Sequence, residues 1–188
     1  MTKLVILMIV AGNLGTAGPP VEEKDTVIDN AVMFNTLFWV NGSGSDTHDA
    51  WSAAIEYHRF IGGSIGLSVA LEYLSTSAYF GYDSFQAFGW GILVGPRFHF
   101  SGQSLKGWYL ATMIGYARMD GAAELVTNTK GNGVSLALEV GYSFASVIGV
   151  MLTLGLGCEY RIFFWDADWA TNTAYFNPRL VLSLGVGW

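Results

Sequence analysis

The sequence predicts an all-β protein in which eight antiparallel strands close into an up-and-down transmembrane β-barrel. Eight segments of strand length alternate apolar residues with small or polar residues, and side chains on a strand point alternately to its two faces. Because 52% of the residues are hydrophobic and only 13% are charged, the apolar faces need more than a small core to cover them. Stretches rich in Gly, Ser and Asp alternate with shorter turns, which is typical of a sheet that threads a membrane.

The first 17 residues have the pattern of a signal peptide. Lys3 precedes an apolar run at residues 4–11, and small residues follow as far as Ala17, after which we expect cleavage. The run is too short for a membrane helix, which needs about 20 apolar residues. Residues 18–26 are polar and contain two prolines, so we expect a periplasmic lead-in there and the barrel over residues 27–188.

The first four predicted strands differ in how cleanly they alternate. Residues 27–40 alternate imperfectly, with one face made of Val32, Phe34, Thr36, Phe38 and Val40. Residues 51–58 and 64–74 form the second and third strands, and the third has an apolar face of Ile65, Leu67, Val69, Leu71 and Tyr73. Residues 87–100 form the fourth, whose apolar face is interrupted by Pro96, a residue that cannot donate to a ladder.

The second half of the chain continues the pattern. Residues 108–116, 134–144 and 148–164 form strands five to seven, and Cys158, the only cysteine, takes a lipid-facing position as a small apolar residue. The closing strand has an apolar face of Leu180, Leu182, Leu184, Val186 and Trp188. Long loops are predicted at residues 41–49, 75–86, 120–132 and 165–174, and turns at residues 59–63, 101–107 and 145–147.

Aromatic residues collect at both ends of the apolar faces, which predicts two belts at the membrane interfaces. The loop-side belt is Trp51, Phe88, Trp90, Tyr116, Tyr160 and Phe176, and the turn-side belt is Tyr57, Phe98, Phe100, Trp108, Tyr142, Phe144 and Trp188. The competing architecture is a soluble barrel with its apolar faces turned inward. Such a barrel would expose Gly, Ser and Ala, and an eight-stranded interior has no room for so many large side chains.

The closing strand carries a family resemblance. Its alternating apolar residues lead through Leu184 and Val186 to Trp188, and this ending resembles the C-terminal strand of bacterial outer-membrane β-barrels, which the assembly machinery reads. The whole chain resembles the small outer-membrane barrels such as OmpX, OmpW and the membrane domain of OmpA. This resemblance implies a location in the cell outer membrane, with lipid and the assembly machinery as partners.

Charged and titratable residues lie on the predicted inward face, namely Glu56, His58, Glu72, Arg97, His99, Glu139, Glu159, Arg161 and Arg179. Counting back from a turn near Ile61 places Glu56 beside Gly66 and Gly66 near Arg97, so we expect Glu56 and Arg97 to meet inside the barrel. Glu72, Glu159, Arg161 and Arg179 should form a second group nearer the loops. The sequence therefore predicts a lumen filled by ion pairs, with a gated or proton-selective pore as the alternative.

Other chemistries find little support in the sequence. His99-Phe100-Ser101 has the spacing of a lipid A deacylase pair, but it lies at the turn end with His99 inward, so we expect no enzyme activity. Asp46, His48 and Asp49 are interpreted as a solvated acidic loop rather than a metal site, and no cofactor is expected. The net charge of -6 argues against nucleic acid, which requires a basic surface.

The sequence is compatible with two functions. The first is a structural or interaction protein, a rigid barrel that presents its loops to an extracellular ligand or a host surface. The alternative is a minor transporter or narrow channel for small or hydrophobic solutes.

Overall fold

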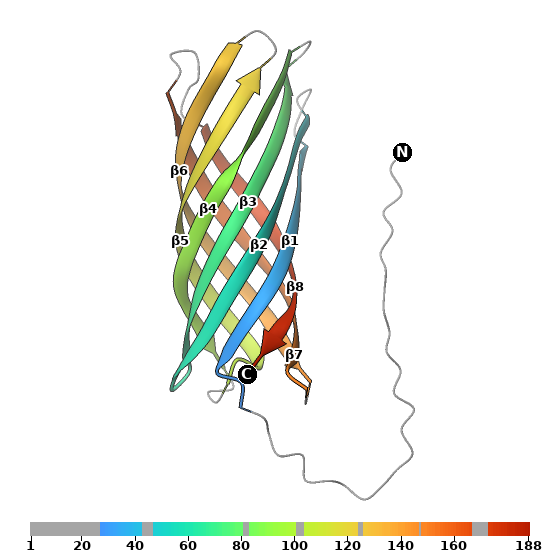
Figure 1. The fold of residues 1–188 in the computed structure, drawn as a ribbon, viewed down its shortest axis with the longest axis vertical. Helices are drawn as coiled ribbons and strands as arrows, with labels where there is room; N and C mark the ends of the chain where they lie inside the picture. Colours follow the sequence, from blue (N-terminus) through green and yellow to red (C-terminus); the bar gives the residue numbers. More distant parts are fainter. Residues whose placement is uncertain are drawn as a thin grey trace, which may run out of the picture.

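The chain forms a closed barrel of eight antiparallel strands, each paired with its neighbours in sequence and the last paired with the first (Figure 1). The computed structural model describes residues 27–42, 47–80, 83–100, 104–123, 126–146, 148–166 and 173–188. The strands are β1 (Asn30–Gly42), β2 (Thr47–Gly62), β3 (Ile65–Phe80), β4 (Asp83–His99), β5 (Gly107–Ala123), β6 (Val126–Ala145), β7 (Val150–Trp165) and β8 (Thr173–Gly187). The predicted fold class and strand number are confirmed. Over these residues, no helix has the length and hydropathy to cross a membrane.

Alternation along the strands produces an apolar outer wall and a small or polar interior, as predicted. On β7, Leu154 is 45% exposed while Thr153 beside it is 1% exposed. Each exposed apolar side chain on this wall needs an apolar environment. Residues 1–26, with the expected signal peptide and lead-in, lie outside the described part of the chain.

Both aromatic belts lie on the outer wall. Among their described side chains, the exposed members are Phe88, Trp90, Tyr116, Tyr160 and Phe176 on the loop side and Tyr57, Phe98, Phe100, Trp108, Phe144 and Trp188 on the turn side. Tyr142 is half-buried, with its ring centroid 5.4 Å from that of Trp108 and 4.6 Å from that of Phe144. The side chain of Trp51 lies outside the described side chains.

The predicted bounds of the long loops are wrong, because the strands continue well past the loop-side belt. Residues 41–49, 75–86 and 120–132 are mostly strand, and the connections on that side shorten to residues 43–46, 81–82, 124–125 and 166–172. Connections on the turn side cover residues 63–64, 100–106 and 146–149, so the expected alternation of long loops with short turns is wrong.

The outward residues above the belt explain this difference. Beyond Tyr116, the outer face of β5 continues with Arg118 and Asp120, and Asp120 pairs with Lys130 of β6. These polar side chains face outward, but the backbone ladder beneath them is unbroken. The change of composition therefore marks where the apolar wall ends, and not where the strands end.

The first turn lies two residues later than the sequence suggested. Gly62 and Gly63 both have positive φ values, 128° and 65°, and glycine adopts these without the steric cost of a Cβ. They make the turn, so the ladder runs through Arg59 to Phe60, which pairs with Gly66. Pro96 does interrupt its ladder, since no pairing joins Gly95 or Pro96 to β5.

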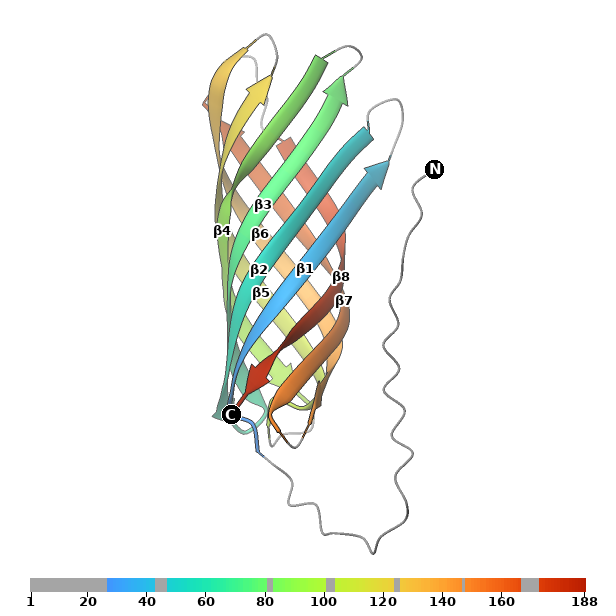
Figure 2. The ribbon, with the colours of Figure 1, turned by 45° about the vertical axis from the view of Figure 1, so that its right-hand side comes forward.

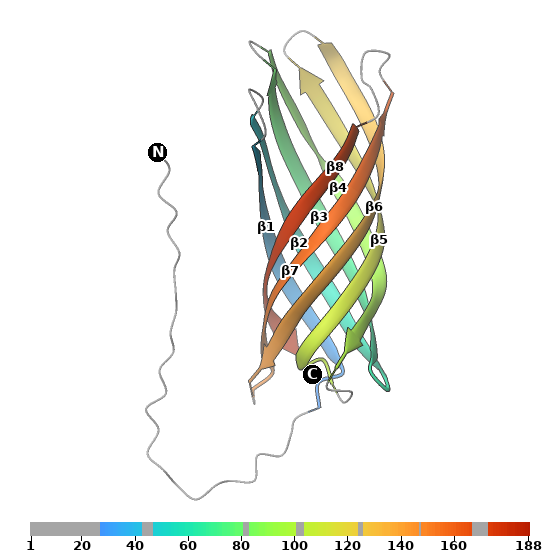
Figure 3. The ribbon, with the colours of Figure 1, turned by 180° about the vertical axis from the view of Figure 1, so that it is seen from behind.

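The closure between β1 and β8 is shorter than the other ladders. It runs only from the Ala31–Gly187 pair to the Asn35–Ser183 pair. Above these pairs β1 stays paired with β2 and β8 with β7, while β1 and β8 separate from each other (Figures 2 and 3).

Candidate functional site

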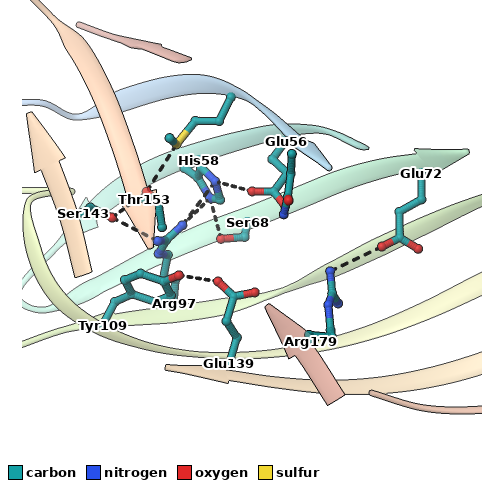
Figure 4. Close-up of polar contacts among 12 residues, drawn as sticks. Glu56, His58, Ser68, Glu72, Arg97, Tyr109, Glu139, Ser143, Thr153 and Arg179 are labelled. Atoms are coloured by element: carbon teal, nitrogen blue, oxygen red, sulfur yellow. Dashed lines mark hydrogen bonds and ion pairs between the residues drawn. The ribbon is translucent and has the colours of Figure 1, made fainter. Parts of the chain in front are cut away.

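The nine predicted charged and titratable residues all lie on the interior face, and each is at most 7% exposed. Eight of them form two groups at different heights, which we call the turn-side polar layer and the loop-side polar layer, and His99 belongs to neither. The turn-side layer contains Glu56, His58, Arg97 and Glu139 (Figure 4). The loop-side layer contains Glu72, Glu159, Arg161 and Arg179.

His58 connects the turn-side layer. Its Nε2 lies 3.1 Å from Glu56 Oε2, and its Nδ1 lies 2.8 Å from Ser68 Oγ and 3.1 Å from Arg97 Nη1. Arg97 can only donate, so these contacts fit a tautomer in which Nε2–H donates to Glu56 and Nδ1 accepts. Asn35 Nδ2 donates to the other oxygen of Glu56 at 2.8 Å.

The prediction that Glu56 contacts Arg97 directly, over Gly66, is wrong. Gly66 does pair with Arg97, but Glu56 pairs with Ala70, because the turn lies at Gly62 and Gly63. Glu56 therefore lies two pleats from the expected position and reaches Arg97 through His58.

Arg97 is held by a stack as well as by hydrogen bonds. Its guanidinium carbon lies 3.4 Å from the centre of the Tyr109 ring, and its Nη2 donates to Ser143 Oγ at 3.1 Å. The Tyr109 hydroxyl donates to Glu139, so Tyr109 connects a cation to a carboxylate. The ring fits because a Cβ at Gly141 would lie 2.5 Å from the tyrosine oxygen.

His99 lies below this layer and differs from the other charged and titratable residues. It is fully buried, and its ring packs against those of Phe60 and Tyr109, with centroids 6.1 and 6.2 Å away. Among the described side chains, neither ring nitrogen of His99 has a hydrogen-bond partner.

Arg161 is the centre of the loop-side layer. Its Nε donates to Glu159 at 2.8 Å and its Nη2 to Glu72 at 2.9 Å. Arg179 lies farther out, with Nη2 3.6 Å from Glu72 and Nη1 3.8 Å from Glu159. Two arginines thus face two carboxylates, and the layer is neutral as a whole. The sequence placed these four residues together correctly.

Apolar layers separate and cap the polar ones. Along the inward face of β3 the residues are Ser68, Ala70, Glu72 and Leu74, which belong in turn to a polar, an apolar, a polar and an apolar layer. The middle apolar layer is Ala70, Leu93, Met113 and Ala137. The loop-side cap is Leu74, Ala87, Ala117, Met119 and Phe163, and the turn-side cap is Ile28, Ala31, Met33, Leu105 and Met151.

The turn-side cap joins two segments outside the strands. Ile28 and Leu105 are 0% and 2% exposed, and the Leu105 N–H donates to the Ile28 carbonyl at 3.0 Å. A small cavity about the size of a water molecule lies in the turn-side layer, lined by residues that include Glu56, Arg97 and Glu139.

Four partners in the turn-side layer were not predicted from the sequence, namely Tyr109, Asn35, Ser68 and Ser143. Each occupies an inward position of its strand, so polar or aromatic residues among glycines and alanines were the available signal. Ile28 and Leu105 carried no such signal, because strand periodicity does not reach them.

The described residues give no support to a deacylase-like pair at His99-Phe100-Ser101 or to a metal site in the acidic segment. Ser101 of the His99-Phe100-Ser101 motif and Asp46 of the acidic segment lie outside the described residues, and His48 and Asp49 belong to β2. In the described ranges, no three His, Cys, Asp or Glu residues are placed to hold a metal ion.

The residues of the expected assembly signal lie on the outer wall, Leu184 and Val186 on β8 and Trp188 directly after it. Leu184, Val186 and Trp188 are 59%, 56% and 62% exposed. The Trp188 N–H also donates to the Asn30 carbonyl at 2.9 Å, so this residue helps to close the barrel. Recognition of these side chains by the assembly machinery stays a prediction.

Comparisons with known proteins agree with the architecture. No family model and no curated protein matches the sequence. Among solved structures, Neisserial surface protein A (NspA) is similar with a TM-score of 0.53 and 15% identity, over 85% of this chain and 97% of that one. The beta domain of the Bordetella autotransporter Brka is similar with a TM-score of 0.50 and 13% identity, over 83% of this chain and 68% of that one. The chain therefore has the fold of the small eight-stranded outer-membrane β-barrels.

Proposed function

We propose that this protein is an outer-membrane barrel with a closed interior, and that it acts through the rim that its strands extend beyond the loop-side belt. The observation that carries this proposal is the stack of interior layers, in which apolar caps lie beyond both polar layers. Among the described side chains, these caps interrupt the polar lining of the interior, which supports a barrel without a continuous path for water and ions. A rigid scaffold that presents a polar rim to an extracellular ligand or a host surface fits this geometry.

The outer wall supports the location in lipid. Exposed Leu, Val and Ile side chains cover the strands between the two aromatic belts, and a bilayer satisfies such a band. We therefore propose that outer-membrane lipid surrounds the outer wall of the barrel. The assembly machinery is the partner that we expect to recognise Leu184, Val186 and Trp188.

The separation of β1 from β8 is the one observation that favours transport of small or hydrophobic solutes. However, the polar layer at that height stays covered, because Glu72 and Arg179 are each only 3% exposed. A side entrance for solutes would expose them. A closed scaffold is therefore the better-supported function, and we propose no catalytic role.

Conductance tests the closed interior. Purified, folded protein in a planar bilayer should give no sustained current steps, whereas reproducible ion-selective conductance would reject the closed interior in favour of a channel. Radiolabelled solute flux into liposomes provides the matching test for uncharged solutes.

Surface labelling tests the location and the orientation. In a Cys158→Ser background, Lys130→Cys above the loop-side belt should react with a membrane-impermeant maleimide in intact cells. Arg59→Cys, exposed at the turn end of β2, is the matched control and should react only after lysis. Labelling of Arg59→Cys in intact cells would reverse the orientation.

A further inference from the structure

The loop-side part of the β1–β8 seam leaves two strand edges unpaired. The ladder stops at the Asn35–Ser183 pair, although β1 continues to Gly42 and β8 begins at Thr173. Figure 3 shows the two strands diverging above this pair. We call the unpaired stretches, residues 36–42 and 173–182, the open seam.

The hydrogen-bonding pattern identifies the backbone groups that face the open seam. Asn30 and Trp188 exchange both of their backbone hydrogen bonds, at 2.9 and 3.0 Å. In an antiparallel ladder every second residue has this role, so Leu182, Leu180 and Pro178 present their backbone to the seam. Pro178 has no N–H, and proline within a sheet is confined to edges of this kind. The sequence thus marks β8 as an edge at the height where the ladder ends.

These edges lie at the depth of the apolar wall. The side chains of Phe176, Leu180 and Leu182 are 61%, 65% and 49% exposed, below or at the loop-side belt. If the protein lies in a membrane, as proposed above, lipid surrounds this stretch. Lipid offers no hydrogen bonds, so open sheet edges are not tolerated there.

We propose that a second copy of this chain covers the open seam. A two-fold axis along the membrane normal keeps both barrels in the same orientation and places β8 of one copy beside β1 of the other. β1 and β8 run in opposite directions, so both new contacts are antiparallel ladders. Continuing the existing register pairs Thr36 with Leu182 and Phe38 with Leu180 across the two copies.

The chemistry favours a strand over a lipid chain as the occupant. Each edge is a row of N–H and C=O groups at the spacing of a strand, and an acyl chain has neither donors nor acceptors for it. The chain itself supplies two edges of opposite direction, and the two-fold arrangement satisfies both at once. Each barrel stays closed on its own through the five residues Ala31 to Asn35 and their partners.

Disulfide trapping in trans tests the dimer. In a Cys158→Ser background, Thr36→Cys and Leu182→Cys are made in separate, differently tagged chains and reconstituted together in vesicles. Opposed residues of an antiparallel ladder have Cα atoms about 5.5 Å apart, which suits a disulfide. After mild oxidation, the mixed disulfide dimer should exceed either homodimer severalfold. Phe38→Cys with Leu180→Cys is the second pair, in case the first does not fold.

The paired part of the seam provides the matched control. Val32 and Val186 are partners within one chain, so Val32→Cys and Val186→Cys in separate chains should give no mixed dimer, while the two changes in one chain should form an internal disulfide. If Thr36→Cys with Leu182→Cys in one chain gives only an internal disulfide, the seam closes on itself and the proposal is wrong.

Two further readouts separate the possible failures. Flotation of the vesicles shows whether the protein is in the membrane at all, and its absence would reject the proposed location. Floating protein that native mass spectrometry finds as a monomer, alone or with a bound lipid, would reject the dimer and leave the location standing.

Discussion

Replacing Arg161 by Met should destabilise the barrel more than any other single charge removal in the loop-side layer. Arg161 donates to Glu72 and to Glu159 at 2.9 and 2.8 Å, and it is 6% exposed. Methionine fills a similar volume but leaves two buried carboxylates facing one arginine. The neutral layer then carries an uncompensated negative charge.

The geometry sets the size of the effect. Removing one partner of a buried ion pair typically costs about 3–5 kcal/mol. Arg179 lies 3.6 Å from Glu72 and 3.8 Å from Glu159, and two of its nitrogen atoms have no hydrogen-bond partner among the described residues. These free donors can turn toward the carboxylates, so we expect a loss of about 3 kcal/mol, at the lower end of that range.

Urea-induced unfolding in lipid vesicles, followed by tryptophan fluorescence, measures this free energy. Arg118→Met, on the exposed outer face, is the control and should change it by less than about 0.5 kcal/mol. Adding Glu159→Gln to Arg161→Met restores neutrality and should recover about 1–2 kcal/mol. Equal stability of Arg161→Met and the parent, or strictly additive losses in the double variant, would refute the charge-balance argument.

Three further perturbations test other parts of the structure. If the outer wall faces lipid, as proposed, Leu154→Arg on that wall should cost about 2–4 kcal/mol, while the inward Thr153→Ser should cost little; equal tolerance in the same urea assay would mean that the faces are reversed. Gly141→Ala should cost about 1–3 kcal/mol, because its Cβ would lie 2.5 Å from the Tyr109 oxygen, and an unchanged unfolding midpoint would contradict that close approach. Asp166 accepts hydrogen bonds from the Lys130 N–H at 2.6 Å and a threonine hydroxyl at 2.9 Å, and these hold the pKa of its carboxyl below the usual value. Its contribution is present above the ordinary aspartate pKa and is lost as pH falls through the lowered one. Protection from hydrogen exchange at the loop-side end of β6, corrected for the intrinsic pH dependence of amide exchange, should fall on acidification in the parent and stay constant in Asp166→Asn.

The two faces of each strand could be predicted from the sequence because the period of two is a local property. Leu154 and Thr153 are neighbours with opposite exposure, and no knowledge of pairing is needed to separate them. Strand number and closure followed from the same repetition. For this reason the predicted apolar outer wall, both belts and the inward placement of the charges agree with the structure.

Contacts across the lumen could not be derived in the same way, because they depend on register. A shift of the first turn by two residues moved the partner of Glu56 from Gly66 to Ala70. In the turn-side layer this shift replaced an expected Glu56–Arg97 pair by one bridged through His58. In the loop-side layer, the contact between Glu159 and Arg161 does not depend on register, because both residues lie on β7.

The apolar caps of the interior can be recognised in the sequence, because large apolar residues occur at inward positions that are otherwise small or charged. The inward face is mostly Gly, Ala, Ser and charged residues, yet it also contains Met33, Met151, Leu93, Met113, Leu74, Met119 and Phe163. The first two of these seven belong to the turn-side cap, the next two to the middle layer and the last three to the loop-side cap. A water-filled channel would gain nothing from large apolar side chains on its lining, since each would face water at a cost. In a barrel this narrow they fill the space between and beyond the two polar layers. Large apolar residues on the small face of a strand therefore favour the closed interior that we propose for this barrel.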